Sequence, residues 1–198
     1  MKPQRPRLAS ALGFTIIDMV ATLAIIATVA TVATPSIKDA VDSMRLGMAL
    51  RDVERELQFA RLKAVTTNRP MRVRFSCPSA GRLRVVELIG TPAGAPNPAD
   101  TAANRCDETL YPFRPTGADS NRLTRPNNDG PVRYLQAGAT FSASTTLEFW
   151  PDGSVHADAG TGNPWPVVGV AGATITVARK SKTKNVTVNF LGKIQLDR

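Results

Sequence analysis

The stretch Gly13-Phe14-Thr15-Ile16-Ile17-Asp18-Met19-Val20 decides the fold, because it opens an apolar run that continues to Ile37. Asp18 is the only ionisable side chain between Phe14 and Ile37. A helix needs about 20 apolar residues to cross the hydrocarbon core of a bilayer, so the run predicts a membrane-spanning helix over 14–37. A carboxylate at mid-bilayer costs at least about 2.5 kcal/mol, so we expect Asp18 to have a function and a partner.

Two simpler interpretations compete with a processed membrane helix. One is a secretory signal peptide, with Lys2, Arg5 and Arg7 as its basic region and a cut near Thr28-Val29-Ala30. Such peptides are built on an apolar core of about 7–15 residues that is cut at its far end, and this run is longer and contains an acid. The other interpretation is an uncut anchor.

The same residues resemble a type IV prepilin signal: a short basic leader ending in Gly13, then Phe14, an acid at the fifth position and Pro35 at the twenty-second. The resemblance implies that prepilin peptidase cuts between Gly13 and Phe14 on the cytoplasmic side and that the new Phe14 amine is methylated. It also implies that Asp18, where the family usually has Glu, pairs with a neighbouring subunit's N-terminal amine. The expected division is a leader over 1–13, a transmembrane half-helix over 14–37 and a periplasmic head over 38–198.

Composition limits the chemistry of the head. The formal charge of +9 includes three leader cations, so the mature chain keeps 22 Lys and Arg against 16 Asp and Glu, an excess that favours anionic surfaces. The single histidine, His156, offers no metal cluster and no second base, and no phosphate-binding glycine loop is present. We therefore expect a non-enzyme without cofactor or metal. The two cysteines, Cys77 and Cys106, fit one disulfide in an oxidising compartment; two separate thiols are the alternative.

Periodicity predicts one long helix followed by strands. Beyond Pro35, apolar residues recur at helical spacing along Ile37, Val41, Met44 and Met48, and then on a slightly rotated stripe at Leu50, Val53, Leu57, Ala60 and Ala64. Charged residues, Asp42 among them, fill the other face, and Pro70 ends the helix near residue 66. Alternating runs then predict strands at 71–75, 82–85, 132–135, 145–150, 173–178 and 185–190. The Pro-rich insert around 91–130 matches no pattern.

Three later segments narrow the resemblance: Leu57-Gln58-Phe59-Ala60-Arg61-Leu62-Lys63-Ala64-Val65, Phe149-Trp150-Pro151-Asp152-Gly153-Ser154, and Leu191-Gly192-Lys193-Ile194. They resemble the FimT/GspH family of type IV minor pilins and type II secretion pseudopilins. The resemblance implies a type IV pilin-like α+β fold, with a long helix packed on antiparallel sheets. It further implies a filament subunit that starts in the inner membrane and assembles with other pilin or pseudopilin subunits. A subunit of the secretion pseudopilus tip and a DNA-receptor pilin for natural transformation are the alternatives.

Basic residues provide the candidate DNA-binding site. Arg179, Lys180, Lys182 and Lys184 fall between two strand patterns, so we expect a hairpin tip, with Lys193 following. Such a cluster binds phosphates without reading sequence; a solvated turn is the equally favoured alternative. Some FimT-like pilins bind DNA through a C-terminal Gly-Arg-x-Arg motif, where this chain has Gly192-Lys193-Ile194-Gln195 and so lacks the second cation. A second set, Arg72, Arg74, Arg82 and Arg84, is predicted to form an ordinary polar outer face.

Overall fold

The computed structural model describes residues 15–89, 98–113, 128–160 and 164–197. It confirms the α+β class: a long N-terminal helix is followed by strands that all pair antiparallel. The chain divides into two compact units, residues 1–41 and residues 42–198. Gly13 and Phe14 lie outside the described residues.

Helix α1 runs over Ile16–Thr67 and contains Pro35. Asn68 ends it in the left-handed region at φ 50°, while the amides of Asn68 and Arg69 donate to the carbonyls of Val65 and Ala64. This is a Schellman cap, in which asparagine replaces the usual glycine. In the first unit the helix is apolar and exposed, and it is long enough to cross a membrane by length and composition.

The second half of α1 buries the later of the two predicted stripes. The buried apolar positions are Leu46, Ala49, Leu50, Val53, Leu57, Ala60 and Ala64, which follow the 3.6-residue period of a core-facing helix. The earlier stripe does not join this core, because Val41, Met44 and Met48 are 37%, 68% and 43% exposed. Asp42, expected on the charged outer face, is instead buried.

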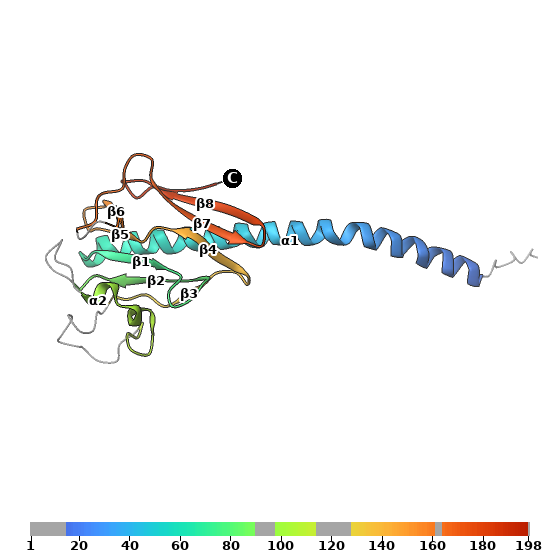
Figure 1. Cartoon of the computed structure of the whole chain (residues 1–198), viewed down its shortest axis with the longest axis horizontal. Helices are drawn as coiled ribbons and strands as arrows, with labels where there is room; N and C mark the ends of the chain where they lie inside the picture. The colour runs from blue at the N-terminus through green and yellow to red at the C-terminus, as the bar shows by residue number, and fades with distance from the viewer. Residues whose placement is uncertain (1–14, 90–97, 114–127, 161–163, 198) are drawn as a thin grey trace, which may run out of the picture. The chain divides into compact units, whose positions relative to one another are not determined.

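Two antiparallel sheets lie against this half of the helix (Figure 1). The five-stranded sheet has the order β3-β2-β1-β5-β6, formed by Arg133–Tyr134, Arg82–Glu87, Met71–Phe75, Leu147–Phe149 and Val155–Ala157. The four-stranded sheet has the order β4-β7-β8-β9, formed by Ala139–Ser144, Ala173–Arg179, Lys182–Val188 and Ile194–Leu196. The runs predicted from alternation all contain strands; β4, β6 and β9 were missed because they are short or polar.

One core joins the helix to both sheets. Val73 and Val85 of the first sheet and Ile175 and Val186 of the second are each 1% exposed or less, and all belong to the cluster that includes Leu57 of α1. The opposite face of the first sheet is covered by a different part of the chain. The short helix α2 (Pro98–Thr101) and the 3₁₀ helix η1 (Ala103–Cys106) lie over β1 and β2, so part of the unmatched insert is a third layer.

Candidate functional site

Asp18 lies at the start of α1 and completes a local cap. Its Oδ2 accepts hydrogen bonds from the Thr15 amide at 3.2 Å and the Thr15 hydroxyl at 2.7 Å, and its own amide lies 3.3 Å from the Thr15 hydroxyl oxygen. This reciprocal pattern is a capping box, with Asp in place of the more common Glu. The carboxylate of Asp18 therefore accepts hydrogen bonds at the start of the helix, although the side chain is exposed. Its pairing with a neighbouring subunit's amine during assembly stays a prediction.

The predicted cationic hairpin is tighter than the sequence suggested. β7 ends at Arg179 and β8 begins at Lys182, so only Lys180 and Ser181 form the turn between them. Lys180 adopts a positive φ of 52°. Arg179 is 6% exposed, and its Nε donates to Asp42 Oδ1 at 3.1 Å. Lys180 Nζ lies 2.5 Å from Asp42 Oδ2. Two of the five candidate DNA-binding cations are thus held by one carboxylate of α1, and Arg179 is withdrawn from the surface.

Lys193 lies at the opposite end of the second sheet from the hairpin turn. It lies in the turn after β8, whereas Lys180 precedes the start of β8, and seven residues of strand separate the two ends. At about 3.3 Å per residue these ends are roughly 20 Å apart. The hairpin and Lys193 therefore lie at opposite ends of the sheet and do not form one basic patch. Their role as DNA-binding residues stays a prediction.

The arginine face of β1 and β2 is also not the solvent-exposed surface expected. Arg72 and Arg84 are 3% and 0% exposed. Both donate to backbone carbonyls of the insert: Arg72 to Asp100 O at 3.0 Å, and Arg84 to Arg105 O at 2.7 Å and to Tyr111 O. The arginines therefore bind the peptide carbonyls of the covering segment, which the alternation of apolar and charged residues could not reveal.

Arg72 also forms a buried ion pair within the sheet. Its Nε and Nη2 lie 3.0 and 2.6 Å from Glu148 Oε1, and its guanidinium lies 4.1 Å from the centre of the Trp165 ring. Arg74, at the edge of the same face, donates to the carbonyls of Ala102 and Thr101. The pair and the stacked ring hold the arginine in the orientation that reaches the insert.

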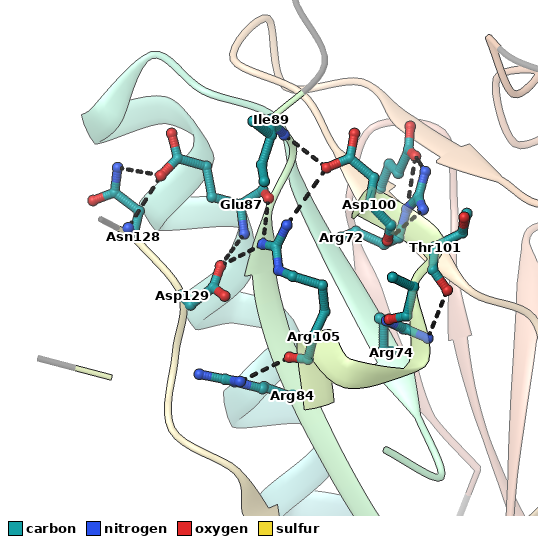
Figure 2. A network of polar contacts seen from close by, with 12 residues as sticks. Arg72, Arg74, Arg84, Glu87, Ile89, Asp100, Thr101, Arg105, Asn128 and Asp129 are labelled. Carbon is teal, nitrogen blue, oxygen red and sulfur yellow. Dashed lines mark hydrogen bonds and ion pairs between the residues drawn. The ribbon is translucent and has the colours of Figure 1, made fainter. Parts of the chain in front are cut away.

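Figure 2 shows the side chain of Arg105, which comes from η1 in the insert, reaching toward Glu87 of β2 inside a network that sequence reasoning missed. Its Nη2 lies 2.8 Å from both Asp129 Oδ1 and Glu87 O, and its Nη1 lies 3.6 Å from Asp100 Oδ1. The same two carboxylates also accept hydrogen bonds from backbone amides. Asp129 accepts from the Glu87 amide and Asp100 from the Ile89 amide, each at 2.8 Å. Burial raises the pKa of Asp129, and Arg105 partly offsets that rise.

A disulfide holds the same segment. Cys106, the last residue of η1, directly follows Arg105 and is bonded to Cys77, which follows β1. The two Cα atoms are 5.3 Å apart, and both side chains are buried. The disulfide and the arginine network therefore fasten one stretch of the insert to one sheet. Among the described residues, no group of three or more His, Cys, Asp or Glu side chains could hold a metal ion.

His156, the single histidine, is a strand residue. It lies in β6, stacked on Trp150 with ring centres 4.6 Å apart, and its Nδ1 is 2.6 Å from Trp165 O. Its Nε2 lies 3.1 Å from the Ser154 hydroxyl, which also bonds Asp152 in the turn before the strand. These contacts order the β5–β6 turn.

The sequence profile of the family described as "Type II transport protein GspH" matches residues 49–192. The chain belongs to the GspH family. No curated protein and no solved structure gave a match. The region matched to the GspH family begins inside α1, includes the five-stranded sheet, the insert and strands β4, β7 and β8, and stops just before β9. The family supports a role as a pseudopilin or minor pilin in type II secretion, and with it a structural rather than an enzymatic part.

One contact of this GspH family member joins Asp42, which precedes the matched region, to Lys180 within that region, and it can be tested by titration. The hydrogen bond from Lys180 is the largest cause that lowers the pKa of Asp42, and Arg179 adds to it. A lowered folded-state pKa contributes stability above the unfolded value of about 3.9, which is lost as the pH falls through the folded pKa. We expect Lys180→Ala to raise the pKa of Asp42 measured by carboxyl NMR. Lys193→Ala, at the other end of the sheet, is the control and leaves this pKa unchanged.

Proposed function

We propose that this chain is a minor pseudopilin: a filament subunit held in the inner membrane by α1, with residues 38–198 in the periplasm, until it enters a type II secretion pseudopilus. The observation that carries the proposal is α1 itself. Its first part is apolar, exposed and interrupted only by Asp18 before Lys38, while its second part carries the helix face that packs on both sheets. One helix thus joins a membrane-spanning length to a folded head. The disulfide agrees with an oxidising compartment.

Processing belongs to the same proposal. Prepilin peptidase removes residues 1–13 and the Phe14 amine becomes methylated, which leaves the capping box of Thr15 and Asp18 next to the new N-terminus. Mass spectrometry of protein extracted from membranes tests this step. An intact Met1, or a start near Thr31, would contradict it.

Deleting the chain tests the role in secretion. The secreted proteins should accumulate in the periplasm, while surface pili and DNA uptake remain at normal levels. Loss of pili with normal secretion would assign the chain to a type IV pilus, and loss of DNA uptake alone would favour the receptor. The family match favours secretion among these three. Among the described residues, the five candidate cations do not form one patch, so this geometry does not favour a DNA receptor.

Asp18→Ala is expected to leave membrane insertion and cleavage intact and to reduce recovery in sheared filaments at least about ten-fold, because a neighbouring subunit's amine loses its carboxylate partner in a low-dielectric setting. Asp18→Asn, which keeps the size and an acceptor oxygen for Thr15, separates the charge from the cap. Asp18→Glu is the conservative control and assembles normally. If the Asn variant assembles like the natural chain, the carboxylate serves the cap and pairs with nothing.

A further inference from the structure

The last strand, β9, has an open outer edge. It pairs with β8 on one side, and among the described residues no strand pairs with its other side. Just past the strand, the Asp197 amide donates to the carbonyl of Asn185 in β8. Because the backbone groups of a strand alternate in direction, Gln195 also bonds toward β8, whereas the amides and carbonyls of Ile194 and Leu196 point outward. These outward groups are placed to pair with another strand.

An apolar groove lies beside this edge, between α1 and β9. Its volume is about 530 Å³. Leu62 and Val65 of α1 line the groove and are 62% and 51% exposed, and Ile194 lines it from β9. Ile194 pairs with the buried Val188, so its side chain points to the same side of the sheet as the core. A strand added about 4.8 Å beyond β9 would place every second side chain over Leu62 and Val65.

The groove carries uncompensated positive charge. Arg61 and Lys193 line it, and both are exposed. Neither forms an ion pair in the part of the chain that the structure describes, and the groove is lined by no acid from that part. An occupant that carries a carboxylate would therefore meet two cations that have no other partner.

The open edge favours an extended occupant over a helical one. A helix satisfies its own backbone groups, so a helix in the groove would cover the outward groups of Ile194 and Leu196 without bonding them. Covering a polar backbone group without a partner is unfavourable. A strand pairs with the same groups, and its alternate side chains fill the groove.

The added strand does not come from β9 of a second copy. The sheet runs alongside α1, because Asp42 binds Lys180 before β8 begins and Arg61 Nη1 lies 3.5 Å from Gly192 O after β8 ends. Antiparallel pairing of two β9 strands about a two-fold axis would point the two α1 helices in opposite directions. Two chains anchored by α1 in one membrane share one direction.

We propose that β9 and this groove bind an extended segment of another protein, which adds a strand to the four-stranded sheet. The backbone of the segment pairs with the outer edge of β9, and its apolar side chains cover Leu62 and Val65. An acidic side chain between them meets Arg61 and Lys193. Because β9 has only three residues, the groove and its charge supply much of the recognition.

A defined peptide tests the site. The probe is the fluorescein-labelled, end-blocked peptide Thr-Val-Thr-Glu-Thr-Val-Thr, whose valines and glutamate lie on one face of a strand. Fluorescence anisotropy follows its binding to the purified full-length chain in detergent micelles. We expect saturable binding with a Kd below about 1 mM. The peptide with Lys in place of Glu should bind at least about ten-fold more weakly, because like charges then meet in the groove.

Leu196→Pro tests the backbone pairing. Proline removes the outward amide of residue 196 but none of the amides that bond β8, and edge strands tolerate proline at such positions. We expect binding of the probe to weaken at least about ten-fold. Leu196→Ala, which keeps the amide, is the matched control and should stay within about two-fold. Peptide mapping of the Cys77–Cys106 disulfide in each variant confirms that the head has folded.

N-methylated probes test the same pairing from the side of the peptide. One probe is methylated on the amides of both valines, and the other on the amides of the two threonines that flank the glutamate. Because amides alternate in direction along a strand, only one of these sets faces β9. We expect one probe to lose binding and the other to keep it.

Removing the two cations tests the charge. In the chain that carries both Arg61→Ala and Lys193→Ala, the Glu and Lys peptides should bind equally, because no cation remains in the groove to distinguish them. The variant keeps the outward backbone groups of β9, so the two N-methylated probes should still differ.

Any one of four outcomes overturns the proposal. These are no saturable binding of the probe below about 1 mM, equal binding of the Glu and Lys peptides to the natural chain, equal losses from Leu196→Pro and Leu196→Ala, and equal binding of the two N-methylated probes. The titration uses the purified chain, so its result does not depend on the role in secretion. Deletion of the chain tests that role separately, and either proposal can fail while the other holds.

Discussion

Arg105→Ala is expected to lower the free energy of unfolding of the head by about 3–5 kcal/mol at neutral pH, because it leaves two buried carboxylates without their cation. Arg105 has no exposed surface and lies between Asp129 and Asp100, whose side chains are 1% and 6% exposed. Water cannot replace the guanidinium at such a site without opening the insert. Urea unfolding followed by tryptophan fluorescence measures the loss, since Trp165 stacks on Arg72 beside the insert.

The pH dependence of this loss distinguishes a charge effect from a packing effect. Burial raises the pKa of Asp129 above its unfolded value, so the group stabilises the fold most when it is protonated. That contribution is full below the unfolded pKa of about 3.9 and is lost as the pH rises through the folded pKa. Without Arg105 the folded pKa rises further. The deficit of the variant should therefore shrink as the pH is lowered from 7 toward 4.

Arg55→Ala provides the matched control. Arg55 pairs with Asp52 at 3.4 Å on the surface of α1, where its side chain is 75% exposed, so its loss should cost no more than about 0.5 kcal/mol. A deficit for Arg105→Ala that stays constant between pH 4 and 7 would falsify the charge argument and leave only lost packing.

Most of the fold could be predicted because it rests on periodicity. Val53, Leu57 and Ala60 repeat at helical spacing, and Met71 and Val73 alternate with arginines, so the helix face and the first strand follow from local sequence. The same rule failed for Met44 and Met48, whose spacing is helical although they stay 68% and 43% exposed and lie outside the core cluster. Spacing shows that a helix has an apolar face, but it does not show what covers that face.

The arginine network could not be predicted because its partners are backbone carbonyls. Arg72 and Arg84 have the alternation of a solvated face, and the segment that covers them is poor in apolar residues. A weaker signal was present: Asp100 and Asp129 lie in the insert, and four arginines lie on one predicted sheet face. Complementary charge between a sheet and an insert could have suggested docking. It could not have identified Arg105, which belongs to the insert yet binds its two acids.

The disulfide was foreseen from cysteine count and compartment, and its removal is the second large effect we expect. Replacing Cys77 and Cys106 by Ser opens a loop whose ends are 29 residues apart. The unfolded chain then gains conformational freedom that corresponds to about 3–4 kcal/mol of lost stability. The same urea titration measures this loss, and adding reductant to the natural chain should reproduce it, whereas reductant should leave the double variant unchanged.

Combining this pair of changes with Arg105→Ala tests whether the disulfide and the network act on the same segment. If Arg105→Ala releases the insert from β1 and β2, the disulfide closes a loop that is already loose in the folded state, and removing it costs less. The summed deficits of the separate variants should therefore exceed the deficit of the combined variant by about 1 kcal/mol or more, the size of coupling found between residues that share a network. Additive deficits would mean that the insert stays docked without Arg105, held by the donation of Arg72 and Arg84 to its carbonyls.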